Sequence, residues 1–496
     1  MGAEVSHVPA TPADYNVFSI TIRSPDKIRV ADAPETVIDI IRTCISEYYD
    51  YHLQAEEIGI EGGRHFKLAG NPFAKSSGFE LSVSSKFLFA KLLAKLFQIG
   101  WKPFLNSDLS RQFDNSTLFF HQCIPADREF SICCLSPSHN DKFQLINASN
   151  TLYQVLLASV GNLLQNTEEF EGTLFTVKMH GCLWDGESTT ARALMLNIFR
   201  NFRIAGFSFF GSMNFKGTAD SIFFINDGST LPPEDYCVIS LNQKDRLRLV
   251  ECPPELVDVM ADAVANKWHG GLQGQFRDET FAEFKMGGYP WRAWDREDAV
   301  LSRLFVAEIL ETSVANGWAV LTALDICRSA DDKAIFVMRQ CTPMRIPHFC
   351  IAPSEDDRIR IIGADANMKE ILADIIRQCW TPGIQAETIG VAEDHELKLA
   401  GRPWGGACVL ARIMMTRILT SLETLGWSVI CSADVSAKYI NVRHGNSRHD
   451  EIPADTHAWF VAQTSLLTVP QCHASAPAAS LDDNSAPPSY EEATRT

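Results

Sequence analysis

The sequence lacks the long apolar segments that membrane-spanning or secreted chains carry. It has no stretch of about 18 consecutive apolar residues, the length that a helix needs to cross a bilayer. Its start also lacks the basic stretch and following apolar stretch of a secretory signal. We therefore expect a cytoplasmic protein that neither spans a membrane nor is exported.

Basic residues are also scarce. The chain carries 44 Lys and Arg against 61 Asp and Glu, a formal net charge of −17. A surface of this sign repels phosphate backbones, which removes the electrostatic attraction that supplies most nonspecific nucleic-acid binding. The composition therefore predicts no nucleic-acid partner.

Motifs for catalysis, cofactors and metals are missing as well. The 14 cysteines include no CxxC pair, and the adjacent Cys133 and Cys134 would point to opposite faces of a strand. We find no P-loop, HExxH, GxSxG or dinucleotide fingerprint. We expect reduced, buried thiols, and the sequence gives no support for an enzyme, a cofactor or a bound metal.

What the chain does contain is a fourfold internal repeat. A glycine–aromatic signature recurs at intervals of roughly 110 residues, as Gly70-Asn71-Pro72-Phe73, Gly181-Cys182-Leu183-Trp184, Gly288-Tyr289-Pro290-Trp291 and Gly401-Arg402-Pro403-Trp404. About thirty residues after each copy, a second mark recurs as Gly100-Trp101, Gly206-Phe207, Gly317-Trp318 and Gly426-Trp427. Two independent marks with one period predict four diverged copies of one unit.

Each copy has the pattern of a β-hairpin, a helix, a strand, a second helix and a closing hairpin. The first copy shows the opening hairpin at 18–23 and 27–30, and the third shows the closing strands at 318–324 and 334–338. Short connections predict an α+β fold, with a mostly antiparallel sheet and two helices on one face of it. The unit is much longer than a solenoid repeat, so we expect each copy to bury its own core as a domain.

The two marks and the changes in composition set the expected boundaries. We predict a flexible amino terminus at 1–15, repeat units at 16–126, 127–232, 233–345 and 346–465, and a disordered tail at 466–496. The tail is rich in Ala, Ser and Pro and lacks the apolar spacing that a packed core needs.

One polar position recurs in the loop after each glycine–aromatic strand, as Asp108, Asn214, Asp325 and Asp434. One hypothesis is a ligand-binding loop repeated four times, with a site between paired repeats of a small-molecule or lipid-binding protein, or an enzyme. The alternative, which we favour, is structural, because Asp and Asn stabilise turns by bonding their own backbone. Convergence of the four side chains on one concavity would favour the ligand site.

Three other patterns also favour structural interpretations. The tryptophans at the repeat marks are expected in the core, where they pack helices on sheets: Trp101, Trp291, Trp318, Trp404 and Trp427. The helix at 87–99, with its neighbouring lysines, is broad enough in its apolar face to be buried rather than membrane-bound. We interpret the cluster of potential metal ligands in the last copy as an exposed insertion loop: His444, His449, Asp450, Glu451, Asp455 and His457.

The amino terminus matches the myristoylation pattern. Gly2 follows Met1, and Ser6 stands four residues further on. A chance match is the alternative, because starts with Met and Gly are common. One myristoyl chain gives only reversible membrane binding, and no cysteine or basic cluster lies nearby as a second signal. We therefore expect transient attachment to the cytoplasmic face of a plasma or endosomal membrane.

The tail contains Pro487-Pro488-Ser489-Tyr490, which resembles the PPxY ligand of WW domains. Two prolines favour a polyproline II strand that docks on an aromatic groove, and Tyr490 would fill an adjacent pocket. The resemblance implies a WW-domain partner such as a Nedd4-type ubiquitin ligase.

Together, the two termini predict an intracellular multi-repeat adaptor or scaffold, reversibly attached to a membrane, that recruits WW-domain proteins. The ligand-binding protein above is one alternative. A second is a self-associating structural scaffold in which both terminal motifs are accidental.

Overall fold

The structure is a computed structural model that describes residues 16–466, apart from 60–61, 111–113, 171, 216–218, 230, 328–332, 391, 407, 437–438, 445–447 and 454. The predicted myristoylation site at Gly2 and the PPxY residues Pro487, Pro488 and Tyr490 lie outside the described residues. No described helix is long and apolar enough to cross a membrane.

The chain forms four α+β units, as the repeat pattern predicted. The first consists of β1 (Val17–Arg23), β2 (Lys27–Ala31), α1 (Glu35–Tyr48), β3 (Leu53–Ile58), β4 (Arg64–Leu68), α2 (Phe79–Gln98), β5 (Trp101–Ser107) and β6 (Asp114–Gln122). Its six strands form one antiparallel sheet in the order β3-β4-β2-β1-β6-β5.

The other units repeat this order of elements. The second has β7 (Ser131–Ser138), β8 (Lys142–Ile146), α3 (Asn150–Val160), β9 (Leu164–Phe170), β10 (Leu174–Met179), α4 (Thr189–Ile204), β11 (Ser208–Met213) and β12 (Ser221–Asn226). The third has β13 (Tyr236–Asn242), β14 (Arg246–Val250), α5 (Pro254–Lys267), β15 (Leu272–Arg277), β16 (Phe281–Met286), α6 (Arg296–Ala315), β17 (Trp318–Leu324) and β18 (Ile335–Gln340).

The fourth unit differs by an inserted hairpin. It has β19 (His348–Ser354), β20 (Arg358–Ile362), α7 (Ala366–Cys379), β21 (Ile384–Ile389), β22 (His395–Leu399), α8 (Val409–Thr424), β23 (Ser428–Ala433) and β26 (Ala458–Ala462). The hairpin of β24 (Tyr439–His444) and β25 (Arg448–Pro453) lies between the last two strands of its sheet, in chain order. Short 3-10 turns occur at Gly161–Leu163 and Thr464–Leu466.

The two repeated marks have clear structural causes. Gly100, Gly206, Gly317 and Gly426 end the second helix of each unit with φ of 89°, 86°, 84° and 79°, a conformation that only glycine adopts without strain. In the other mark the aromatic residue is fully buried, and the indole of Trp291 donates a hydrogen bond of 2.7 Å to the carbonyl of Arg246 on β14. Trp184 and Trp404 make the equivalent bond, so this indole holds the loop onto the sheet.

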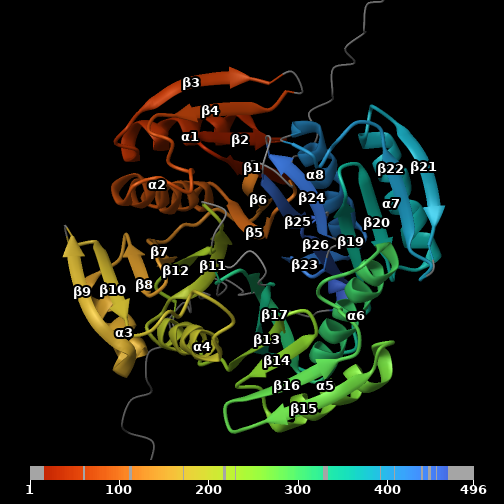
Figure 1. The fold of residues 1–496 in the computed structure, drawn as a ribbon. Coiled ribbons are helices and arrows are strands. Elements are labelled where there is room, and N and C mark those ends of the chain that lie inside the picture. The colour runs from red at the N-terminus through yellow and green to blue at the C-terminus, as the bar shows by residue number, and fades with distance from the viewer. Residues whose placement is uncertain are drawn as a thin grey trace, which may run out of the picture.

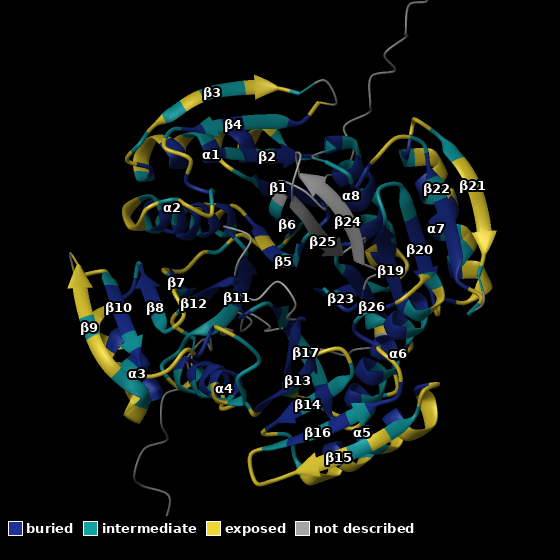
Figure 2. Ribbon diagram, in the orientation of Figure 1, coloured by how far each residue is buried: buried dark blue, intermediate teal, exposed yellow. Residues whose placement is uncertain are grey.

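The sequence pattern missed one strand in each unit. β3, β9, β15 and β21 form the outer edge of each sheet, where Figure 2 shows them mostly exposed. Because these strands face solvent, they lack the apolar alternation by which a half-buried strand is recognised. The observed unit therefore has three hairpins rather than two.

The four units form a closed ring. The second helix of each unit packs on the first strand of the next: α2 on β7, α4 on β13, α6 on β19, and α8 on β1. Figure 1 accordingly places the first unit, in red and orange, beside the last, in blue. The contact between the fourth and first units is thus equivalent to the three that the chain connects.

This packing changes the expectation that each copy buries its own core. The first strands β1, β7, β13 and β19 are buried almost throughout, because helices cover both faces of the sheet. Each apolar core continues into the neighbouring unit; Ile132 and Phe223 of the second unit, for example, belong to the core of the first. The units are therefore fused through shared cores.

Candidate functional site

The four recurring polar residues follow the inner edge strands of the ring. Figure 1 places β5, β11, β17 and β23 around its centre, where β5 contacts β11 and β23, and β17 also contacts β23. Directly after these strands come Asp108, Asn214, Asp325 and Asp434. All four are partly exposed and stand between buried neighbours. The ring therefore brings the four loops to its centre.

The contacts of these side chains are local or connect units. The Oδ1 atom of Asp108 accepts a hydrogen bond of 3.0 Å from the backbone of Ser110. In the same way, the Oδ1 atom of Asp325 accepts a hydrogen bond of 3.1 Å from the backbone of Cys327, and both bonds stabilise their turns. Asp434 instead accepts a hydrogen bond of 2.8 Å from the buried Lys333 of the third unit.

The backbone of the same loops links neighbouring units. Asp108, Asp325 and Asp434 each accept, through the carbonyl oxygen, an N–H bond from an adjacent unit. The donors are His457, Asp220 and Ala334, at 3.2, 2.6 and 3.3 Å. The donors occupy equivalent positions in their sheets, just before the strand that pairs with β7, β13 or β19. The arrangement joins units, and within the described residues no group of three or more His, Cys, Asp or Glu could hold a metal ion.

The protonation of Asp220, which lies in this region, is strongly perturbed. Its carboxylate is buried and accepts a hydrogen bond of 2.9 Å from the backbone of Asp325. Burial raises its pKa to about 7, because a charged carboxylate loses its hydration there. At the equivalent position of the fourth unit, burial lowers the pKa of His457. Both groups therefore favour their neutral forms in the fold.

A buried cation marks each junction between units. Lys86, Arg192, Arg303 and Arg412 occupy one equivalent position on the second helix, and their exposed fractions are only 5%, 1%, 1% and 3%. Lys86 donates to Gln144 of the second unit at 3.1 Å. Arg303 donates to Asp455 of the fourth unit at 2.9 Å. The sequence analysis noted only that lysines accompany the helix at 87–99, although alignment of the copies on their second glycine shows a basic residue at this position in all four.

The interpretation of the segment around Asp455 as an exposed loop is wrong at this residue, because Asp455 is buried. Its side chain is only 4% exposed, and it binds Arg303 as well as the backbone N–H of Glu355, at 3.0 Å. It comes after the inserted hairpin and before β26. A local pattern could not show this, because the partner comes from the preceding unit, about 150 residues away.

A cavity of about 510 Å³ opens between the first unit and the linker to the second. Its walls include Tyr48, Lys91, Lys95, Arg128 and Phe130. Lys91 donates to Asn147 at 2.8 Å, and burial lowers its pKa. Three cations against two acids, Asp127 and Glu129, make this cavity locally basic in an acidic protein.

One domain-family model matches the chain four times, over residues 16–121, 131–225, 235–339 and 347–462. The chain belongs to this family. Each matched range covers one unit of the ring, from its first strand to its last. No curated protein and no solved structure matches the chain. The family assignment therefore establishes the fourfold domain architecture and assigns no ligand to the ring.

Proposed function

We propose that this four-domain protein is an adaptor. The ring is a rigid platform, Gly2 carries a myristoyl group, and Pro487, Pro488 and Tyr490 recruit a WW-domain protein such as a Nedd4-type ubiquitin ligase. The observation that best supports the proposal is that both ends of the described chain leave the ring at one junction, between the fourth and first units.

Three contacts locate the two ends. The carbonyl of Asn16 accepts a hydrogen bond of 3.1 Å from Gln122. The adjacent His121 lies 3.9 Å from Glu423 in the last turn of α8. The backbone of Ser465 donates to Gly426, two residues beyond that helix, at 3.0 Å. A lipid and a peptide ligand attached to these ends would therefore be tethered at the same place.

This placement suits recruitment at a membrane. One myristoyl chain binds a bilayer weakly and reversibly, so the adaptor would exchange between membrane and cytoplasm. A WW-domain protein bound to the tail would be held near the same surface and gain effective concentration there. The rest of the ring surface stays available for cargo.

Gly2→Ala and Tyr490→Ala variants test the two halves separately. We expect intact mass to show one myristoyl group on the wild type, and Gly2→Ala to lose both this mass and the membrane-bound fraction. Tyr490→Ala should keep the lipid and lose binding to an isolated WW domain. A wild-type chain without the lipid, in cells with N-myristoyltransferase, would remove the membrane half of the proposal. Unchanged WW binding by Tyr490→Ala would remove the other half.

The basic cavity supports a second candidate function, the binding of a small anion between two repeats. Lys91, Lys95 and Arg128 supply the positive charge, and Tyr48 and Phe130 supply apolar walls. Calorimetric titration with inorganic phosphate and with a short fatty acid should show binding that a Lys91→Met/Arg128→Met variant loses. Equal heats from the variant and the wild type would remove this candidate.

A further inference from the structure

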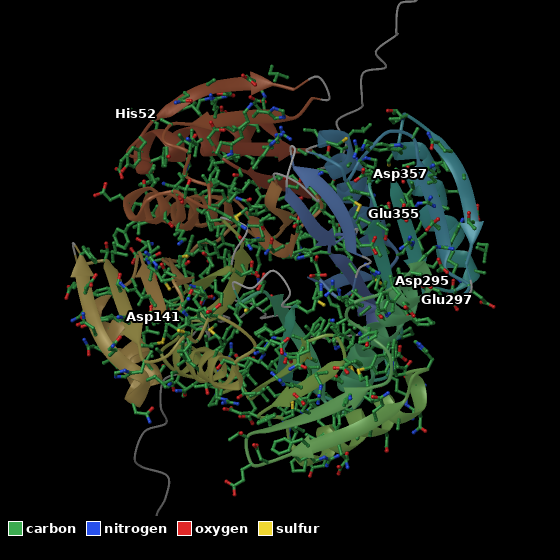
Figure 3. All side chains as sticks on the ribbon, in the orientation of Figure 1. His52, Asp141, Asp295, Glu297, Glu355 and Asp357 are labelled. Carbon is green, nitrogen blue, oxygen red and sulfur yellow. The ribbon has the colours of Figure 1, made fainter. Side chains whose placement is uncertain are left out.

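The third unit displays an exposed aromatic pair. Trp294 is 71% exposed and Tyr289 is 45% exposed, yet their rings contact each other edge to face with centroids 5.8 Å apart. Both lie in the loop between β16 and α6. Figure 3 places this region, through the neighbouring Asp295 and Glu297, beside the start of α6 at the junction with the fourth unit. Exposed tryptophan and tyrosine are typical of the centres of binding surfaces.

The fold itself does not require these two aromatic residues. The positions equivalent to Tyr289 hold Asn71, Cys182 and Arg402 in the other three units. At the position of Trp294 the first two units have Ser76 and Glu187. The same loop therefore forms without them, and their packing contributes little to the core. Two large exposed apolar side chains that contact each other are typical of a surface that binds a partner.

The loop holds the pair in a fixed frame. Trp291, which comes between Tyr289 and Trp294 in the chain, is fully buried, and its indole donates a hydrogen bond to the carbonyl of Arg246. Ala293 donates its N–H to Ser436 of the fourth unit at 3.2 Å, and Trp294 donates its N–H to Asp298 at 3.2 Å. A preorganised aromatic pair loses little entropy on binding.

We propose that Tyr289 and Trp294 bind a proline-rich segment in polyproline II conformation, and that the occupant is this chain's own Pro487-Pro488 tail. Proline rings stack well on aromatic faces, and a polyproline II strand has little entropy to lose. Lys244, whose Nζ lies 5.8 Å from the centroid of the Tyr289 ring, and the acids at the start of α6 flank the pair, so the docking rests on the aromatic faces rather than on charge.

The geometry of the ring allows the tail to reach this pair. Ala462, four residues before the last described residue, packs with Val314 in the last turn of α6. Trp294 lies just before the other end of α6, whose 20 residues span about 30 Å. The roughly twenty residues between Leu466 and Pro487 can extend to about 70 Å, which exceeds this distance with room for a path around the unit.

Docking of the tail would regulate the proposed adaptor, and this inference rests on that proposed function. The same prolines cannot occupy the aromatic pair and a WW domain at once. A covalently tethered ligand has an effective concentration on the order of 1 mM. With an intrinsic Kd of about 0.1 to 1 mM, docking would weaken WW binding by the full chain about two- to tenfold.

A peptide of residues 478–496, titrated into the full chain that carries Pro487→Ala/Pro488→Ala, tests the contact directly. Removal of the chain's own ligand leaves the aromatic pair free. We expect saturable binding with a Kd near 0.1 to 1 mM, read by NMR or fluorescence anisotropy, and at least tenfold weaker binding when Trp294→Ala is added. The matched control is Phe276→Ala, which removes an aromatic side chain that is 50% exposed on the outer edge strand β15 and should leave peptide binding unchanged.

The regulatory consequence is tested with an isolated WW domain. We expect the domain to bind the free peptide two- to tenfold more tightly than the full chain, and Trp294→Ala to remove the difference. Equal affinities for peptide, full chain and Trp294→Ala would overturn the inference while leaving the adaptor intact. If the WW domain does not bind even the free peptide, the proposed function fails instead. The titration of the preceding paragraph then still decides whether the tail docks.

Discussion

At the residue scale, the junctions depend on one buried cation per unit. A charged side chain without water is costly unless it is paired, and at the positions of Lys86 and Arg303 a side chain of the next unit supplies the partner. Arg303 uses the carboxylate of Asp455, whereas Lys86 uses the neutral Gln144 and Ser82. The cation at this helix position therefore has a charged partner at one junction and neutral partners at another.

Asp455→Ala should destabilise the protein by about 3 to 5 kcal/mol, because it leaves the guanidinium of Arg303 buried and unpaired. Chemical denaturation measures the loss. The double variant Arg303→Met/Asp455→Ala should be more stable than Asp455→Ala alone, since it removes the orphaned charge. A loss below about 1 kcal/mol for the single variant would show that the pair is not what stabilises this junction.

The raised pKa of Asp220 predicts that the stability of the fold depends on pH. Its pKa is about 7 in the folded chain and about 3.9 when unfolded, so between these values only the folded state holds the proton. This contribution is complete below about pH 4, falls as the pH rises towards 7, and is then constant. Asp220→Asn keeps an acceptor for the Asp325 N–H and removes the titration.

Relative to the wild type, Asp220→Asn should gain more than about 1 kcal/mol of stability between pH 5 and pH 8, because one pKa unit corresponds to about 1.4 kcal/mol. Urea denaturation at both pH values measures the gain. The exposed Asp39→Asn is the control and should follow the wild-type profile. If the stability of Asp220→Asn and of the wild type changed with pH in parallel, Asp220 would not be the group that titrates.

At the element scale, α8 closes the ring on β1 and the loops beside it. Arg417 and Thr416 of this helix donate to Asp32 of the first unit at 2.7 and 2.9 Å. Val409, the first residue of α8, packs against Gly63. No peptide linker supports this contact within the described chain, so the packing alone holds it together.

Gly63→Ala should weaken this contact by about 1 to 3 kcal/mol, since the added Cβ would lie 2.7 Å from Cγ1 of Val409. Thermal or urea unfolding of Gly63→Ala, Val409→Ala and the double variant forms a double-mutant cycle. Because the double variant lacks the opposing methyl groups, its loss of stability should be smaller than the sum of the two single losses. Gly274→Ala on the rim, where nothing lies within 4 Å of the added Cβ, should change stability by less than about 0.5 kcal/mol. Strict additivity in the cycle would contradict the contact.

At the scale of the whole molecule, one head-to-tail interface is used four times and closes on itself. A heterologous contact forms a ring when its rotation closes and a filament when it does not. Here four units complete the circle, so the first and last units have no open face left for a fifth. The ring is thus a single folding unit built from four copies of one domain.

Circular permutation should therefore preserve the fold. We expect a chain whose residues 466 and 16 are joined by about eight residues, and which opens between Pro125 and Ala126, to unfold cooperatively with nearly wild-type stability. This length matches the existing linkers between units, at 123–130, 227–235 and 341–347. A control that opens inside the buried strand β13 should fail to fold. Circular dichroism and urea denaturation distinguish the cases, and a permutant that unfolds in two steps would show that the fourth and first units are only loosely joined.

The sequence by itself determined the number of units and their α+β class, because glycines at positive φ and buried aromatic residues are local requirements that recur in every copy. It did not show the outer strands, whose exposed residues carry no periodic signal. The closed ring, the Arg303–Asp455 pair and the raised pKa of Asp220 were decided only by the tertiary structure. Each depends on groups more than a hundred residues apart that burial brings together, and no local pattern records which distant group removes water from a given side chain.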